Sequence, residues 1–194
     1  MTDFEDQKKL ILDQERKFAA QLCRYVLNKP MLNSWMILIP FIFIFYFQDL
    51  AKYKKGKRGF TENFLLTRNK TLDEVEQALT ENRKIDVESI AKQASISSKA
   101  GGKYAEVMAV LAEHYSVLLK GGRGATYEEM LKSAYGNRKK YMIYLEKIDR
   151  AEKALNKALR PELEKSTEGV ADIVSTIERY SEKIRLNDAK EFFA

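Results

Sequence analysis

The chain has 194 residues, of which 32% are charged and 45% are hydrophobic, and its formal net charge is +6. This length accommodates one modest globular domain beside a single long hydrophobic segment. With one cysteine and one histidine, the sequence excludes a disulfide framework and lacks the ligands of zinc and haem sites, so we expect no cofactor. No catalytic motif stands out, and we do not expect an enzyme.

The first predicted element is an amphipathic helix over residues 3–28, within an N-terminal juxtamembrane region that we assign to residues 1–30. A hydrophobic residue recurs every seven positions, at Phe4, Ile11, Phe18 and Tyr25. This spacing is typical of one face of an α-helix. We expect the helix either to lie on a membrane surface or to pack on the C-terminal part of the chain.

The second element, residues 31–50, is the most hydrophobic part of the chain. A helix of this length is about 30 Å long, which matches the hydrocarbon thickness of a bilayer. Its polar residues lie near its two ends, and no residue from 35 to 47 is charged. We therefore expect the following side chains to contact membrane lipid: Trp35, Met36, Ile37, Leu38, Ile39, Pro40, Phe41, Ile42, Phe43, Ile44, Phe45, Tyr46 and Phe47.

Three interpretations of this segment remain open. The leading one is a single transmembrane helix. The second is a re-entrant hairpin bent at Pro40, because proline removes a helical hydrogen bond. In the third, residues 35–47 are the core of a soluble or peripheral bundle, because a helix that is hydrophobic on every side has to be surrounded by protein or lipid.

The third region, residues 51–70, is predicted to be a basic and apolar juxtamembrane linker. Its first part contains a basic cluster made of Lys52, Lys54, Lys55, Lys57 and Arg58. Lysine and arginine beside a membrane segment favour the cytoplasmic side, and each adds about 1 kcal/mol of attraction to anionic lipid. We expect this cluster to fix the topology, with the C-terminal domain in the cytoplasm.

Residues 71–194 are predicted to form an antiparallel bundle of four to five helices, so the expected fold class is all-α. Capping boxes with Thr71 and Thr126 at the N-caps mark two helix starts. Residues 95–102 and 121–124 are expected to be loops, and Pro161 is expected to interrupt the long helix that begins at Thr126. The predicted helices are 71–83, 86–94, 103–120, 126–160 and 162–186, and the last two are expected to form a hairpin.

The helix over 103–120 is the most apolar one outside residues 31–50, and we expect it to be the centre of the core. One face of it is formed by Tyr104, Val107, Met108, Leu111, Tyr115 and Leu118. His114 is expected on the flank of this face. A ferritin-like metal site requires a glutamate three residues before the histidine. Residue 111, which has this position, is a leucine.

One group of basic and aromatic residues is a candidate partner surface: Tyr135, Arg138, Lys139, Lys140 and Tyr144. Such a combination can bind phosphate and stack on nucleic-acid bases. We interpret it instead as a surface for another protein, because tyrosine provides contact area at low entropic cost and is frequent in interfaces. Nucleic acid is not an expected partner in this interpretation.

Together these features predict a membrane-anchored helical interaction protein, an adaptor or a subunit of a membrane-bound assembly. Its expected partners are membrane lipid and other proteins, including a second copy of the chain. The alternative function is that of a soluble or peripheral helical bundle, which binds anionic lipid or nucleic acid through the basic cluster and has residues 35–47 in its core.

Overall fold

The computed structural model describes residues 4–27, 57–92, 98–166 and 170–194, and all regular structure in these ranges is helical. The all-α fold class is therefore confirmed. The expected membrane segment and the first three lysines of the basic cluster lie outside the described residues. Among the helices that are described, none has the length and apolar character needed to cross a membrane. The helices are α1 (Phe4–Leu27), α3 (Lys57–Thr80), α4 (Val87–Lys92), α5 (Ser98–Gly121), α6 (Tyr127–Tyr135), α7 (Arg138–Ser166) and α8 (Val170–Phe192).

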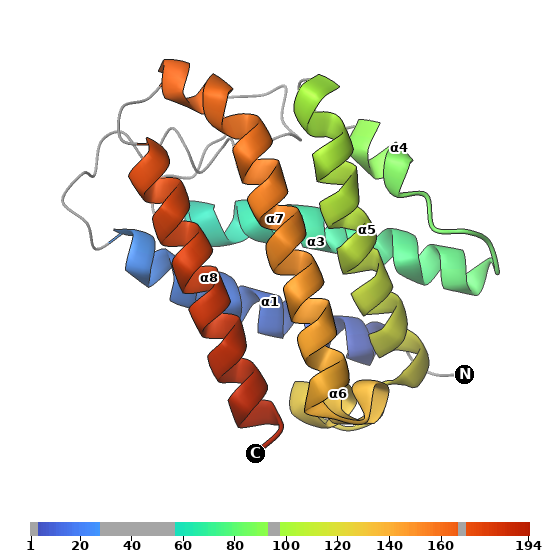
Figure 1. Cartoon of the computed structure of the whole chain (residues 1–194). Coiled ribbons are helices and arrows are strands. Elements are labelled where there is room, and N and C mark those ends of the chain that lie inside the picture. Colours follow the sequence, from blue (N-terminus) through green and yellow to red (C-terminus); the bar gives the residue numbers. More distant parts are fainter. Residues whose placement is uncertain (1–3, 28–56, 93–97, 167–169) are drawn as a thin grey trace.

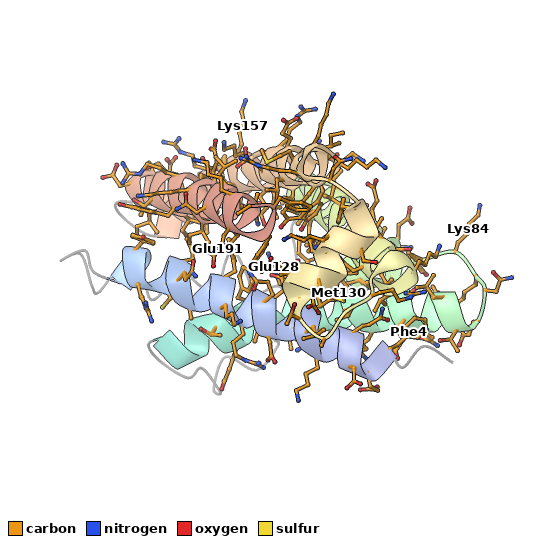
Figure 2. The ribbon with its side chains drawn as sticks, turned by 90° about the horizontal axis from the view of Figure 1, so that it is seen from below. Phe4, Lys84, Glu128, Met130, Lys157 and Glu191 are labelled. Atoms are coloured by element: carbon orange, nitrogen blue, oxygen red, sulfur yellow. The ribbon has the colours of Figure 1, made fainter. Side chains whose placement is uncertain are left out.

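The long helices form two layers that cross each other (Figure 1). Helices α5, α7 and α8 lie side by side in one layer, and α1 and α3 run across them in the other. Figure 2, which is turned by 90°, shows the α1–α3 layer beneath α7 and α8. The short helix α6 packs between the ends of α5 and α7 and also contacts α1.

Helices α1 and α3 are antiparallel, because their contacting residues follow opposite orders along the two helices. These contacts are the ion pairs Lys8–Glu76 and Glu15–Arg68 and the ring pair Phe18–Phe64. The C-terminal end of α1 and the N-terminal end of α3 therefore lie at the same end of this layer. The hairpin predicted for the last two long helices is confirmed by Lys153–Glu182 and Asn156–Glu178, which join α7 and α8 in antiparallel order.

Helix α5 is the centre of the core, as predicted. All six residues of its predicted face are buried, and Tyr115 and Leu118 are completely so. Every described helix contributes at least one side chain to the main hydrophobic cluster around α5. His114 lies in this interior and is 3% exposed, so its predicted place on the flank is wrong.

Helix α1 packs on the C-terminal part of the chain, which is one of the two places predicted for it, and it is part of the core. Ile11 joins the main cluster, and the next two turns of α1 form a second cluster with α3 and α8. Burying a leucine or phenylalanine side chain contributes about 1.5–3 kcal/mol. The members of the second cluster are Phe18, Ala19, Leu22, Cys23, Phe64, Ile177 and Ile184.

The helix start predicted at Thr71 is wrong, because Thr71 lies inside α3. Its hydroxyl is completely buried and donates to the carbonyl oxygen of Thr67, 2.9 Å away, instead of capping a helix. Hydrophobic positions continue on both sides of it, at Phe64 and Leu72, so packing keeps this stretch helical. The region predicted as a linker, 51–70, is accordingly helical from Lys57 onward.

The capping box at Thr126 is confirmed, since the Glu129 amide donates to the Thr126 hydroxyl over 3.2 Å and the Glu129 carboxylate accepts from the Thr126 amide. The long helix predicted after it is divided, because Gly136 has a φ of 72° and ends α6. Pro161 does not end α7, which continues to Ser166. Its neighbours on both sides are exposed, so the proline ring lies on the solvent side.

The loop predicted over 95–102 is shorter than expected. Helix α5 begins at Ser98 and therefore includes Gly101 and Gly102. A Cβ at either glycine would meet no atom within 4 Å outside the surrounding backbone of its own helix. Glycine lowers helix propensity by about 1 kcal/mol relative to alanine, and this penalty is offset here by the packing of the neighbouring residues Ala100 and Tyr104, which are buried.

Candidate functional site

A chain of four charged side chains, called here the buried ion chain, links the two layers of the fold. It consists of Glu15 from α1, Arg68 from α3, Glu152 from α7 and Arg185 from α8. Arg68 donates to both carboxylates, with Nε 3.1 Å from Glu15 and Nη2 3.5 Å from Glu152. Arg185 binds Glu152 through both terminal nitrogens, at 2.7 and 2.8 Å. Two planar groups that meet in this bidentate way form one of the stronger ion pairs in proteins.

The buried ion chain has no net charge, and its members are largely removed from water. The side chain of Arg68 is 4% exposed and that of Arg185 is 11% exposed. Burial alone would raise the pKa of Glu152, but the two guanidinium groups outweigh this effect and hold that pKa below its ordinary value. The guanidinium of Arg68 also lies 3.5 Å from the centre of the Phe64 ring, a cation–π contact that helps to compensate for lost hydration.

A cluster of tyrosines around His114 lies next to the buried ion chain. The Tyr135 hydroxyl is 2.7 Å from Nδ1 of His114, and the Tyr127 hydroxyl is 3.4 Å from Nε2. The Tyr144 ring stacks on the imidazole with centroids 3.9 Å apart and planes 9° from parallel. Burial, together with the positive charge of Arg185, lowers the pKa of His114 to about 3. The imidazole is therefore neutral at physiological pH, with one ring nitrogen donating and the other accepting.

A small cavity with a volume of about 40 Å³ is lined by residues of both groups. It has room for about three water molecules, which is too little for an organic substrate. Asp188 lines it and receives a hydrogen bond of 3.1 Å from the Gln14 amide. Burial and the nearby Glu191 raise the pKa of Asp188 to about 6. The cavity is also lined by Glu15, His114, Tyr127, Tyr144 and Arg185.

The polar groups of this interior are bonded mainly to one another. Glu15 accepts hydrogen bonds from Arg68 and from the Tyr115 hydroxyl, the latter 2.8 Å away, so each of its two oxygens already has a partner. Burial raises the pKa of Tyr115 and Tyr144 well above 10, so both act as neutral groups. Within the described ranges, no group of three or more histidine, cysteine, aspartate or glutamate side chains is arranged to hold a metal ion.

The residues of the predicted partner surface have two different environments. Tyr135 is buried and Tyr144 is half-buried, and both rings contact His114. Arg138, Lys139 and Lys140 are exposed on the first turn of α7. The structure therefore assigns the two tyrosines to the interior cluster, and the role of the three cations in binding a partner stays a prediction.

The buried ion chain was not predicted from the sequence, although helical spacing contains a signal for it. Three of its members are separated by one helical turn from a hydrophobic residue on a buried face. These neighbours are Ile11 for Glu15, Phe64 for Arg68 and Ile148 for Glu152. A charged residue in line with a hydrophobic face is thus a marker for a buried ion pair. This marker is missed when every charged residue is assigned to solvent.

No protein-family model matches the sequence, and neither the curated proteins nor the solved structures include a significant match to it. The role of the protein is therefore inferred from its own residues and their geometry.

Proposed function

We propose that the protein is a membrane-attached helical interaction protein, an adaptor or a subunit of a membrane-bound assembly with its bundle on the cytoplasmic side. The observation that carries this proposal is the uncharged run of residues 35–47, which is followed by the basic cluster. The described helices pack around one main hydrophobic cluster, which agrees with a folded interaction domain beside this segment.

The antiparallel packing of α1 and α3 favours one of the three arrangements of residues 31–50. Helix α1 ends at Leu27 and α3 begins at Lys57, at the same end of the bundle. One helical crossing takes about 20 residues, so a full crossing and return takes about 40, which is more than this stretch contains. We therefore propose a re-entrant hairpin bent at Pro40, entering and leaving the bilayer on one side.

Charge on both sides of the segment agrees with this arrangement. Arg24 and Lys29 precede it and the basic cluster follows it, and positive residues near a membrane segment favour the cytoplasmic side. A single span would place one of these basic flanks on the opposite side. A re-entrant hairpin keeps both on the same side, together with the whole described bundle.

Membrane attachment is tested with the variant Ile42→Arg/Ile44→Arg in the full chain. Arginine near the centre of the hydrocarbon costs about 2.5–3.5 kcal/mol per residue, so this variant is expected to leave the carbonate-washed membrane fraction. The matched control is Ala109→Arg/Ile143→Arg, which adds the same charge at two exposed positions and is expected to remain there. Equal retention of both variants would show that residues 31–50 are not the anchor.

The re-entrant arrangement is tested by labelling the two chain ends from one side of sealed vesicles. Cysteines are introduced singly by Thr2→Cys or Ala194→Cys in a Cys23→Ala background, which removes the one native, buried thiol. A membrane-impermeant maleimide is expected to label both positions equally from the same side. Labelling of the two positions from opposite sides would instead establish a single transmembrane span.

A further inference from the structure

Two exposed or half-exposed tyrosines stack on each other where α1 approaches α8, at the end of the bundle from which residues 28–56 leave. The Tyr25 and Tyr180 rings are 4.0 Å apart, with planes 9° from parallel. Tyr25 is 40% exposed and lies two residues before the end of α1. Figure 1 shows these parts of α1 and α8 at the left of the molecule. The antiparallel packing also brings the first turn of α3, with Lys57 and Arg58, to this end.

Two cations lie near the Tyr180 ring of this stack, and a third is next to Tyr25 in the sequence. The Arg179 guanidinium lies 4.8 Å and the Lys183 ammonium 6.0 Å from the centre of the Tyr180 ring, and Arg24 precedes Tyr25. All three are exposed, and the neighbouring carboxylates of Glu178 and Glu182 bind Asn156 and Lys153 instead. Arg179 and Lys183 are one helical turn apart, where like charges repel each other by a few tenths of a kcal/mol.

We propose that this tyrosine–cation patch, made of Arg24, Tyr25, Arg179, Tyr180 and Lys183, binds the anionic headgroups of a phospholipid bilayer. The inference builds on the proposed membrane attachment and adds a second contact, made by the folded bundle itself. Tyrosine suits the interface because its ring is apolar and its hydroxyl is polar. Lysine and arginine near an anionic surface each contribute about fivefold to affinity.

The arrangement of the rings favours lipid over nucleic acid. Because Tyr25 and Tyr180 stack on each other, one face of each ring is already occupied and cannot hold a base. The three cations come from two helices, and an anionic surface relieves the repulsion between Arg179 and Lys183. The patch is also continuous with the point at which the chain enters the proposed membrane segment. It therefore orients the bundle on the bilayer, with α1 and α8 nearest to the headgroups.

The patch is tested by competition between two populations of vesicles. The full chain is synthesised without cells in the presence of phosphatidylcholine vesicles and of distinguishable vesicles that also contain phosphatidylglycerol. The wild-type chain is expected to prefer the anionic vesicles. Neutralising the patch with Arg24→Gln/Arg179→Gln/Lys183→Gln is expected to reduce this preference about a hundredfold, with the remainder due to the basic cluster.

A matched control loses the same charge elsewhere. Lys84, Lys120 and Lys157 are exposed, and Figure 2 shows the labelled Lys84 and Lys157 pointing away from the bundle at distant places. The variant Lys84→Gln/Lys120→Gln/Lys157→Gln is expected to retain most of the wild-type preference. An equal loss in both variants would overturn the patch proposal, since net charge alone would then account for binding. A carbonate wash tests the membrane segment separately. Release of the wild-type chain by the wash would refute the anchor, whereas the vesicle preference would still report on the patch.

A spectroscopic measurement tests the aromatic part of the patch. In a Trp35→Phe background, Tyr25→Trp provides the chain's one tryptophan. Its fluorescence is expected to shift to shorter wavelengths when anionic vesicles are added, because the ring moves from water to the headgroup region. An unchanged spectrum in a variant that binds the vesicles would overturn the proposed place of the tyrosine stack.

Discussion

Replacing Glu152 with glutamine should destabilise the fold more than any other single change from a carboxylate to an amide on α7. Glu152 is the acceptor that Arg68 and Arg185 share. Glutamine has one acceptor oxygen, and its amide hydrogens point toward groups that are themselves donors. Glu152→Gln therefore leaves Arg185 buried without its bidentate partner, while Arg68 keeps Glu15.

The expected loss depends on the burial of the groups involved. Removing one partner of a buried ion pair typically costs about 3–5 kcal/mol. Because 24% of the Glu152 side chain is exposed, water can solvate the unpaired Arg185 in part, and we expect about 3 kcal/mol. This is a large share of the about 5–15 kcal/mol that stabilises a typical domain.

Urea unfolding of the full chain in mild detergent, followed by circular dichroism, measures this loss. The control is Glu182→Gln, which removes the same charge from an exposed pair with Lys153 on the same helical hairpin, and its expected effect is below about 1 kcal/mol. Because the pKa of Glu152 is lowered from 4.5 in the fold, its contribution is present above pH 4.5 and disappears as the pH falls through the lower folded value. Equal midpoints for the two variants at neutral pH would refute the role given to the buried ion chain.

Burial and backbone geometry lead to four further predictions. Asp188→Asn should stabilise the fold by about 1 kcal/mol at neutral pH in a urea titration, because the pKa of Asp188 is raised from 3.8 to about 6 and the folded state therefore disfavours its carboxylate form. His114→Gln should flatten the loss of stability as the pH falls below 6.5, because the folded-state pKa of about 3 means that mainly the unfolded chain takes up the proton. Gly122→Ala should lower the free energy of unfolding by about 1–3 kcal/mol, because its Cβ would collide with a backbone carbonyl oxygen. Gly101→Ala, with open space around it, should instead stabilise α5 by about 0.5 kcal/mol in the same assay. A chain that begins at Lys57 should lose its cooperative thermal transition, because it lacks the buried side chains of α1.

Sequence reasoning was most successful where a signal is local and a segment has one clear hydrophobic face. The spacing in α5 indicated its buried residues, and the capping box at Thr126 marked the start of α6. A similar pattern at Thr71 predicted a helix start that does not exist. The difference between the two sites is tertiary, because Thr71 is enclosed next to Met108 of α5, whereas Thr126 is exposed and follows a glycine-rich loop.

The polar interior was the part that sequence patterns could not place. A pattern that divides residues into buried apolar and exposed polar classes assigns Glu15, Arg68 and Arg185 to solvent. Their burial depends on the crossing of two layers, which brings together helices separated by about a hundred residues in the chain. His114 illustrates the same limit, since its hydrogen-bond partners Tyr127 and Tyr135 come from a different helix.

The position of the buried ion chain gives it a consequence beyond stability. Helices α1 and α3 lead directly into and out of residues 28–56, and Glu15 and Arg68 fasten them to α7 and α8 through Glu152 and Arg185. If the segment is held in a bilayer, the three-helix layer must follow the orientation of α1 and α3, because a tilt between the layers would separate buried charges at a cost of several kcal/mol. Glu152→Gln should therefore loosen the orientation of α8 on the membrane as well as the fold. A spin label at the exposed position Lys190 should then show a wider distribution of depths in anionic vesicles for this variant than for Glu182→Gln, and identical distributions would show that the layers are not coupled through this chain.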